Sequence, residues 1–355
     1  MLKQYLSFAL ILLSLICDQK PGKSSKIFYK QNDIYTDSGE VNNNFYDNTE
    51  TYKLPVEELF IGGEVANPGK VDFSQLPVRQ VIVKEALLDT LGGDRFTGAF
   101  RYDGYSLFDI LESTVIKKNN SAEFNQVIDL FVEIENDEGE RVVFSWGEIF
   151  YPVNLHKIII AAGVSRIVPS KTGELWSLPG KSRLVAANDL VTERNISSPD
   201  RITVKSYPRS FHVVKGMNPM YAGAIKIIDG NKTIGEVTGI SQDYSINTFN
   251  TIFYGRGKGI HSTSPFSGPA LKEVILNYFP VSSESLKTGL ICIAGVDGYR
   301  CVVSYSELFN RNDQQEFLLI KTGEGEDGGL FRIFAAADFF SDRAIKSVCE
   351  IHKAL

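Results

Sequence analysis

One segment of this sequence concentrates residue types that bind anions. It runs from Tyr254 to Gly268 and reads YGRGKGIHSTSPFSG, so glycines flank two cations, and a histidine and three hydroxyls follow. Glycine lets backbone N–H groups approach an anion closely, and cations with hydroxyls can complete a phosphate or sulfate cradle. A surface loop whose glycines serve only turns is the alternative interpretation. The residues expected to bind an anion or an anionic cofactor are Arg256, Lys258, His261, Ser262, Thr263 and Ser264.

No other pattern of reactive residues indicates a catalytic or metal site. The glycines of this segment lack the spacing of a dinucleotide-binding or P-loop motif. His261 has no identifiable carboxylate partner, and the other histidines are scattered along the chain. Cys292, Cys301 and Cys349 form no Cys-x-x-Cys pair, which favours buried free thiols. The sequence therefore predicts no metal ligands and identifies no catalytic residue.

The anion-binding segment belongs to a chain that repeats itself. NDEGERVVFSWGEIF at 136–150 returns as GVDGYRCVVSYSELF at 295–309, which pairs Glu148 with Glu307. FRYDGYSLFDIL at 100–111 returns as SPFSGPALKEVI at 264–275, and GKSRLVAAND at 180–189 returns as GLFRIFAAAD at 329–338. Matching blocks in the same order indicate a tandem duplication of one domain. Arg183 and Arg332 recur together with Asp189 and Asp338, so an Arg–Asp pair is expected to hold a strand to the following loop in each copy.

The repeated blocks predict a strand-rich α+β fold with short helices. Residues 130–146 and 290–305 alternate apolar and polar side chains around Asp-Glu-Gly and Asp-Gly, which is typical of a β-hairpin. Residues 107–112 and 271–276 have apolar positions at helical spacing after a glycine. Ser145 and Ser304 are candidate N-caps of further short helices, because a glutamate sits in the first turn after each.

Length and charge limit the classes of function. A chain of 355 residues is long enough for about two domains, which agrees with the duplication. The net charge is −6 and no Lys/Arg-rich run occurs, which argues against nucleic acid as a partner. We expect one copy at 55–207, a linker at 208–224 and a second copy at 225–355.

The N-terminus resembles a bacterial lipoprotein signal. Lys3 precedes an apolar stretch from Leu6 to Ile16, too short to span a bilayer, and Cys17 follows. Residues 1–17 are therefore interpreted as a signal peptide, with Cys17 as the lipidated residue; an ordinary cleaved signal or an N-terminal membrane anchor is the alternative. Residues 18–54 are predicted to form a flexible tether. The expectation is an exported protein held on a membrane of the bacterial cell envelope, in the periplasm or at the outer membrane.

The repeated unit resembles the oxidoreductase molybdopterin-binding domain of the sulfite oxidase family. The resemblance covers most of residues 58–353 and depends on the order of short motifs. It implies two tandem sulfite-oxidase-like domains, a molybdopterin cofactor and oxidoreductase activity, with Asp297, Tyr299, Arg183 and Arg332 as structural or binding residues. The matching segments are Gly63–Pro68, Tyr102–Leu111, Phe266–Ile275, Asp297–Tyr299, Ser304–Leu308, Gly180–Asp189 and Gly329–Asp338.

Two hypotheses about function remain open from the sequence. In the first, the protein is an exported oxidoreductase whose second copy binds the molybdopterin through the segment around Arg256. The family's Arg–Cys–Ala–Gly–Asn-like segment, which supplies a cysteine ligand to molybdenum, has no counterpart here. In the second hypothesis, the protein is a non-catalytic, lipid-anchored binding protein for a small anion, a glycan or an unidentified protein partner.

Overall fold

The protein has a strand-rich α+β fold, as expected from the sequence. The computed structural model describes residues 45–89, 93–323 and 328–354, with 41% of these described residues in strands and 12% in helices. The predicted signal peptide, Cys17 and residues 18–44 of the predicted tether lie outside the described residues. Among the described helices, none has the length and apolar character needed to cross a membrane.

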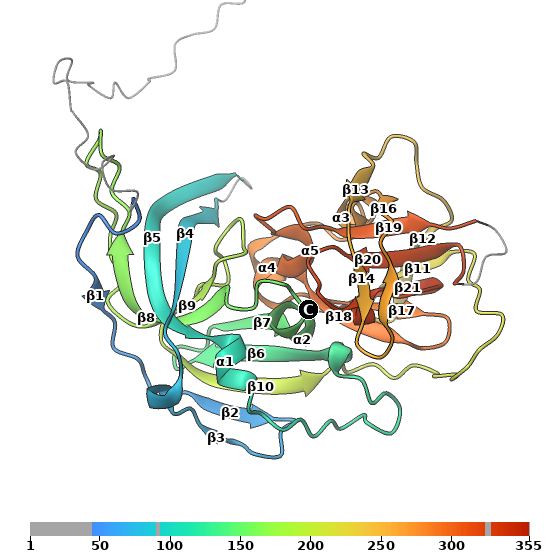
Figure 1. Cartoon of the computed structure of the whole chain (residues 1–355), viewed down its shortest axis with the longest axis horizontal. Coiled ribbons are helices and arrows are strands. Elements are labelled where there is room, and N and C mark those ends of the chain that lie inside the picture. The colour runs from blue at the N-terminus through green and yellow to red at the C-terminus, as the bar shows by residue number, and fades with distance from the viewer. Residues whose placement is uncertain (1–44, 90–92, 324–327, 355) are drawn as a thin grey trace, which may run out of the picture. The chain divides into compact units, whose positions relative to one another are not determined.

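The first half of the fold (residues 45–207, ending in green in Figure 1) contains two five-stranded sheets. In one sheet β2 is parallel to β10, and β6 pairs antiparallel with both β10 and β7. The strands of this sheet are, in spatial order, β3 (Gly69–Lys70), β2 (Phe60–Gly63), β10 (Pro199–Ser206), β6 (Leu130–Asn136) and β7 (Arg141–Ser145). The other sheet contains β1 (Tyr52–Lys53), β8 (Ile158–Arg166), β5 (Asp94–Ser106) and β4 (Arg79–Leu88), with β9 (Arg183–Ala186) paired to β8.

The predicted tether ends earlier than the sequence suggested. Strand β1 pairs with β8, and Leu54 is buried beside it in an apolar cluster. Thr49 also donates its hydroxyl to the carbonyl of Arg166. Residues 49–54 therefore belong to the folded part of the chain. The sequence did not indicate this short edge strand, because the composition of the segment is mostly polar.

The second half (residues 225–354, yellow to red in Figure 1) repeats the first sheet with the same strand directions. Its strands are, in order, β12 (Lys232–Val237), β11 (Ile225–Asp229), β21 (Val348–Ala354), β17 (Leu290–Gly295) and β18 (Arg300–Ser304). Three two-stranded sheets accompany it: β13 (Asn247–Phe249) with β16 (Phe266–Gly268), β14 (Phe253–Gly255) with β15 (Gly259–Ser262), and β19 (Phe317–Lys321) with β20 (Phe331–Ala335). Residues 208–224, between the halves, contain no helix or strand.

The two five-stranded sheets also share their register, residue by residue. One row of buried, paired side chains crosses four strands in each sheet, and three of the four equivalent pairs of members are related by the spacings of the repeated sequence blocks. The rows are Ile61, Ile202, Ile134 and Val142 in the first half, and Ile227, Ile351, Ile293 and Cys301 in the second. Because a slip by one residue would turn every side chain to the other face, this match is strongly specified by the buried pattern.

The hairpins and helices predicted from the repeat are present in both halves. β6–β7 and β17–β18 turn through loops of the same length, and Gly139 and Gly298 both have a φ of +81°, which glycine adopts without strain. Ser106, Ser145 and Ser304 cap short helices with their side chains. The helices are α1 (Leu107–Leu111), α2 (Trp146–Phe150), α3 (Leu271–Ile275), α4 (Ser283–Thr288) and α5 (Tyr305–Phe309), and the 3-10 turns are η2 (Phe73–Gln75), η3 (Val127–Asp129) and η4 (Ser341–Arg343).

Equivalent residues join the two halves in reciprocal pairs. Leu190 donates its backbone N–H to Asn310 at 2.7 Å, and Phe339 donates the equivalent bond to Tyr151 at 2.8 Å. A second pair of backbone hydrogen bonds repeats the pattern. The N–H of Asn312 donates to the carbonyl of Asn188 at 2.9 Å, and the N–H of Val153 donates to the carbonyl of Ala337 at 3.0 Å. Such reciprocity is the property of an isologous, two-fold interface, here formed within one chain.

Candidate anion-binding cleft

The β14–β15 hairpin carries the cationic segment at its tip, beside a cleft of about 380 Å³. Gly255 and Gly259 close the hairpin, so residues 256–258 form its turn. The β17–β18 turn and η4 contribute the other walls of the cleft. Five of the residues selected from the sequence line this space, which we call the anion cleft: Arg256, Lys258, His261, Asp297 and Tyr299.

Arg256 and Lys258 give the anion cleft its positive charge. The Nε of Arg256 donates to Asp342 at 2.7 Å, and neither of its Nη groups has a hydrogen-bond partner among the described residues. Burial opposes the charge of Arg256, but the hydrogen bond to Asp342, together with the nearby Tyr151, Asp342 and Tyr299, raises the pKa of the guanidinium. Lys258 is exposed and makes no ion pair within the described part of the chain. With Lys346, three cationic side chains line the cleft, against the two carboxylates of Asp297 and Asp342.

Tyr299 forms a fixed wall of the cleft. Its hydroxyl donates to the carbonyl of Asp342 at 2.9 Å, and its N–H donates to Oδ1 of Asp297 at 3.0 Å. Burial, followed by the nearby Asp342 carboxylate, raises the pKa of Tyr299, so the phenol stays neutral and keeps its proton. The sequence resemblance pointed to Asp297 and Tyr299, and the structure places both beside the cationic hairpin.

His261 also lines the cleft, but the three hydroxyls after it do not. A Cβ added at Gly255 would lie 2.4 Å from Nε2 of His261, so glycine is required where the imidazole packs on the hairpin backbone. Ser262, Thr263 and Ser264 are not among the residues that line the cleft. The strand β15 ends at Ser262, whose hydroxyl accepts the N–H of Ser264, and Thr263 lies between them.

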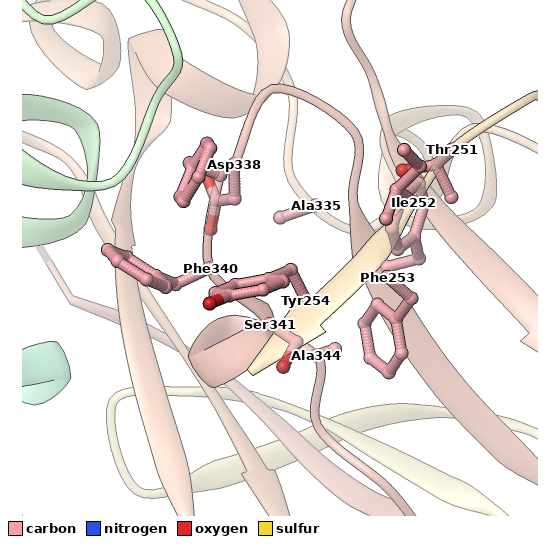
Figure 2. A pocket seen from close by; sticks show the side chains of 11 residues that line it. Thr251, Ile252, Phe253, Tyr254, Ala335, Asp338, Phe340, Ser341 and Ala344 are labelled. Carbon is pink, nitrogen blue, oxygen red and sulfur yellow. The ribbon is translucent and has the colours of Figure 1, made fainter. Parts of the chain in front are cut away.

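A smaller crevice adjoins the anion cleft on the other side of β14. Figure 2 shows Tyr254 reaching from this strand toward Phe340, with Phe253 on the far side of the strand. The space is only about 10 Å³, which is at most the room for one water molecule. The crevice shares Ser341 and Ala344 with the anion cleft, and it is too small to hold a ligand of its own.

Arg183 and Arg332 do not form the predicted pairs with the repeated aspartates. Arg183 instead contacts Glu85 at 3.3 Å, and the Nε of Arg332 is buried without a hydrogen-bond partner. The aspartates bind other arginines, which the sequence analysis missed. Arg194 donates to Asp189 at 2.6 and 2.8 Å and to Glu148 at 3.0 and 3.1 Å.

The second half has the equivalent buried cluster. Arg343 donates to Asp338 at 2.6 and 2.8 Å and to Glu307 at 2.6 Å, and its side chain is fully buried. Each cluster also receives a serine from the other half: Ser145 donates to Glu307 at 2.7 Å, and Ser304 accepts from Arg194 at 3.1 Å. The repeated Asp-x₄-Arg spacing, at the same separation as the repeated aspartates, is the sequence signal that could have identified both arginines.

The first half closes the position equivalent to the anion cleft. The counterparts of Tyr299 and Asp342 in the repeat are Glu140 and Glu193. Glu140 accepts a hydrogen bond from Asn136 at 3.0 Å, and Glu193 accepts the N–H of Leu88 at 2.9 Å. At the equivalent place the first half therefore has two carboxylates held by their neighbours.

One serine, one histidine and one aspartate meet in the first half, but they do not form a hydrolytic triad. The hydroxyl of Ser106 donates to Asp109 at 2.6 Å and lies 3.1 Å from Nδ1 of His156. In a triad the serine and the aspartate occupy opposite ring nitrogens, whereas both face Nδ1 here. Ser106 is fully buried as the N-cap of α1, and Arg79 holds Asp109 in two hydrogen bonds. The arrangement secures the start of a helix.

None of the described cysteines lines the anion cleft. Cys292 and Cys301 are free and fully buried in β17 and β18, and Cys349 is free and partly buried in β21. Burial raises the pKa of the Cys301 thiol to about 12, which keeps it protonated at neutral pH. Within the described residues, no three histidine, cysteine or acidic side chains are grouped so that they could hold a metal ion. Comparison with models of known protein families and with curated proteins finds no match for this chain.

Proposed function

We propose that the protein binds a small anionic ligand in the anion cleft of its second half. The observation that carries the proposal is the pair of Arg256 Nη groups and the Lys258 ammonium, which have no partners among the described residues and border a cleft of about 380 Å³. Hydrogen bonds between charged groups contribute about 1.5–3 kcal/mol each. A phosphate, sulfate or carboxylate between these side chains would gain such bonds without breaking the Arg256–Asp342 pair.

The arrangement supports binding better than catalysis. Ser341 and His261 are the candidate nucleophile and base in the cleft, and both lie against Gly255, yet no hydrogen bond joins them. Catalysis by such a pair requires contact within hydrogen-bond reach and a third group that orients the base. We therefore assign the protein to the non-catalytic class, as a binding protein.

A molybdopterin cofactor is the second candidate, because the repeated sequence blocks resemble those of the sulfite oxidase family. The phosphate of such a cofactor fits the cations of the cleft. A molybdenum centre that takes a ligand from a protein thiolate does not fit, since none of the described cysteines lines the cleft. Measuring molybdenum and pterin per chain, in protein purified from its own host, distinguishes the two candidates: near-stoichiometric amounts would favour this one.

We propose the cell envelope as the location of the protein, on the evidence of residues 1–17 and Cys17. A lipidated cysteine would become the first residue of the mature chain and would keep it on a membrane. Mass spectrometry of the mature N-terminus tests this: an acylated Cys17 supports the anchor, and an unmodified N-terminus at another residue contradicts it.

Thermal unfolding in the presence of anions tests the main proposal. A ligand at a hundred times its Kd stabilises the folded state by about 2.7 kcal/mol. Inorganic phosphate or sulfate should therefore raise the Tm relative to chloride at equal ionic strength. The double variant Arg256→Ala/Lys258→Ala should lose this increase, whereas Lys70→Ala, which removes an exposed lysine of the first half, should keep it. An equal increase in all three proteins would refute the assignment of the anion cleft.

A further inference from the structure

A second cavity of about 250 Å³ adjoins the anion cleft across the β17–β18 turn. Asp297 and Tyr299 line both spaces, so the β17–β18 turn forms a wall of each. The far walls of the second cavity come from residues 121–126 of the first half and from residues 213–215 between the halves. We call this space the second chamber. None of these far-wall residues belongs to a strand.

The turn between the two cavities is held from several sides. Val214 donates its N–H to the carbonyl of Asp297 at 2.8 Å, and a Cβ at Gly298 would lie 2.5 Å from the carbonyl oxygen of His212. The ring of Tyr299 packs edge-on against Phe124, with centroids 5.6 Å apart. A ligand that extends over both cavities would contact the ring of Tyr299, whose position is already fixed. Binding therefore costs little conformational entropy at this side chain.

The second chamber offers neutral polar groups and one further cation. Hydroxyl and amide side chains line it at Ser121, Asn125 and Gln126. Lys215 is exposed and makes no ion pair within the described chain. The carboxylate of Glu123 is already engaged, because it accepts the N–H of Phe211 and pairs with Arg300 at 2.9 Å. Because Asp297 also lines the chamber, its charges do not by themselves favour an anion, but its hydroxyl and amide groups suit a hydroxyl-rich part of a ligand, with Lys215 as one contact for a negative group.

We propose that the anion cleft and the second chamber form one elongated site for an acidic oligosaccharide. One acidic group lies between Arg256 and Lys258, the chain passes Tyr299, and the next hydroxyl-rich unit reaches Asn125 and Lys215. Aromatic rings and side-chain amides recognise sugars through stacking and hydrogen bonds to hydroxyls. An extended peptide would bind best along a strand edge, which the far walls of the second chamber do not provide. The inference depends on the proposed function and specifies its ligand.

Isothermal titration calorimetry of the full-length protein tests the elongated site. The probes are inorganic phosphate, galacturonic acid, trigalacturonic acid, neutral maltotriose and tri-aspartate. Trigalacturonic acid should bind at least about tenfold more tightly than the monomer, a difference of about 1.4 kcal/mol, and maltotriose should not bind measurably. Asn125→Ala and Lys215→Ala should weaken the trimer alone and leave phosphate binding unchanged, whereas Arg256→Ala should weaken both.

Three results would overturn the inference, and they are separable from a failure of the proposed function. The elongated site is wrong if monomer and trimer bind equally, or if Asn125→Ala and Lys215→Ala leave trimer binding unchanged. The choice of an oligosaccharide is wrong if tri-aspartate binds more tightly than the trimer. In each of these cases phosphate binding that depends on Arg256 would still support the anion cleft, while absence of binding by every anionic probe would remove both proposals.

Discussion

Replacing Arg343 with methionine should destabilise the fold more than most single substitutions. Its side chain is fully buried and donates three hydrogen bonds to two carboxylates, Asp338 and Glu307, which are themselves almost fully buried. Removing one partner of a buried ion pair costs about 3–5 kcal/mol, because the remaining charge has no compensation. For a chain of this size the entropy of unfolding is about 0.7 kcal/mol/K, so the Tm should fall by about 4–7 °C. Urea and thermal unfolding followed by circular dichroism measure both quantities.

Arg183→Met is the matched control for this substitution. Arg183 makes an ion pair with Glu85 at 3.3 Å, and its side chain is 21% exposed, so solvent can replace part of what is lost. We expect a loss of about 1 kcal/mol there. Arg194→Met should resemble Arg343→Met, because the two arginines occupy equivalent positions in the duplicated fold.

The cost of Arg343→Met should depend on pH in a defined direction. Burial raises the pKa of Asp338, and the charge of Arg343 opposes that rise. Without the arginine the folded-state pKa should rise further above the unfolded value of about 3.9, so the folded protein binds this proton more tightly than the unfolded chain does. The loss of stability caused by Arg343→Met is therefore largest above the folded-state pKa of Asp338, and it becomes smaller as the pH falls through that pKa.

Two outcomes would refute this reasoning. One is a loss for Arg343→Met no larger than that for Arg183→Met, and the other is a loss that stays constant between about pH 8 and about pH 5. If Arg343→Met does not fold, the triple variant Arg343→Met/Asp338→Asn/Glu307→Gln provides the test. It removes the uncompensated charges together with the arginine, so it should recover part of the stability.

Three further predictions concern the interface between the halves, the hairpin and the thiols. Ser145→Ala and Ser304→Ala should each cost about 1–2 kcal/mol in urea unfolding, because each serine caps a helix and also bonds across the halves; a cost for one alone would contradict this. Gly255→Ala should displace His261 and reduce the Tm increase caused by phosphate, and an unchanged increase would contradict the role of the cleft. The Cys301 thiol should stay unmodified by iodoacetamide at neutral pH until the protein is unfolded in urea, as peptide mass spectrometry would show; labelling of the folded protein would contradict its burial.

Local patterns in the sequence were sufficient to predict the hairpins, the capped helices and the general fold class. The register of β17 and β18 was harder, because a turn confined to Asp297 and Gly298 would set Cys292 opposite position 303. The observed loop also includes Val296, so Cys292 pairs with Val302. Loop length fixes the register of a hairpin, and the Asp-Gly pair is compatible with both lengths.

The anion cleft was only partly predictable. The hairpin around Arg256 could be recognised because its residues are consecutive, whereas Asp342 and Lys346 reach it from the other end of the second half. The contact of Arg194 with Glu148 is a tertiary one that no local pattern encodes, although the Asp-x₄-Arg spacing could have paired Arg194 with Asp189. Arg183 was the more obvious candidate because it lies inside the repeated block, whereas Arg194 follows it.

The most direct test of the proposed function is a crystal structure of the protein soaked in selenate, located by its anomalous scattering. Selenate has the shape and charge of sulfate, and its heavy atom identifies the anion without ambiguity. We predict one ordered ion in the second half, within hydrogen-bond distance of the Arg256 Nη groups and Lys258, and none at the equivalent place beside Glu193. An anomalous map with no peak beside Arg256, while the cleft is open to solvent in the crystal, would contradict the account.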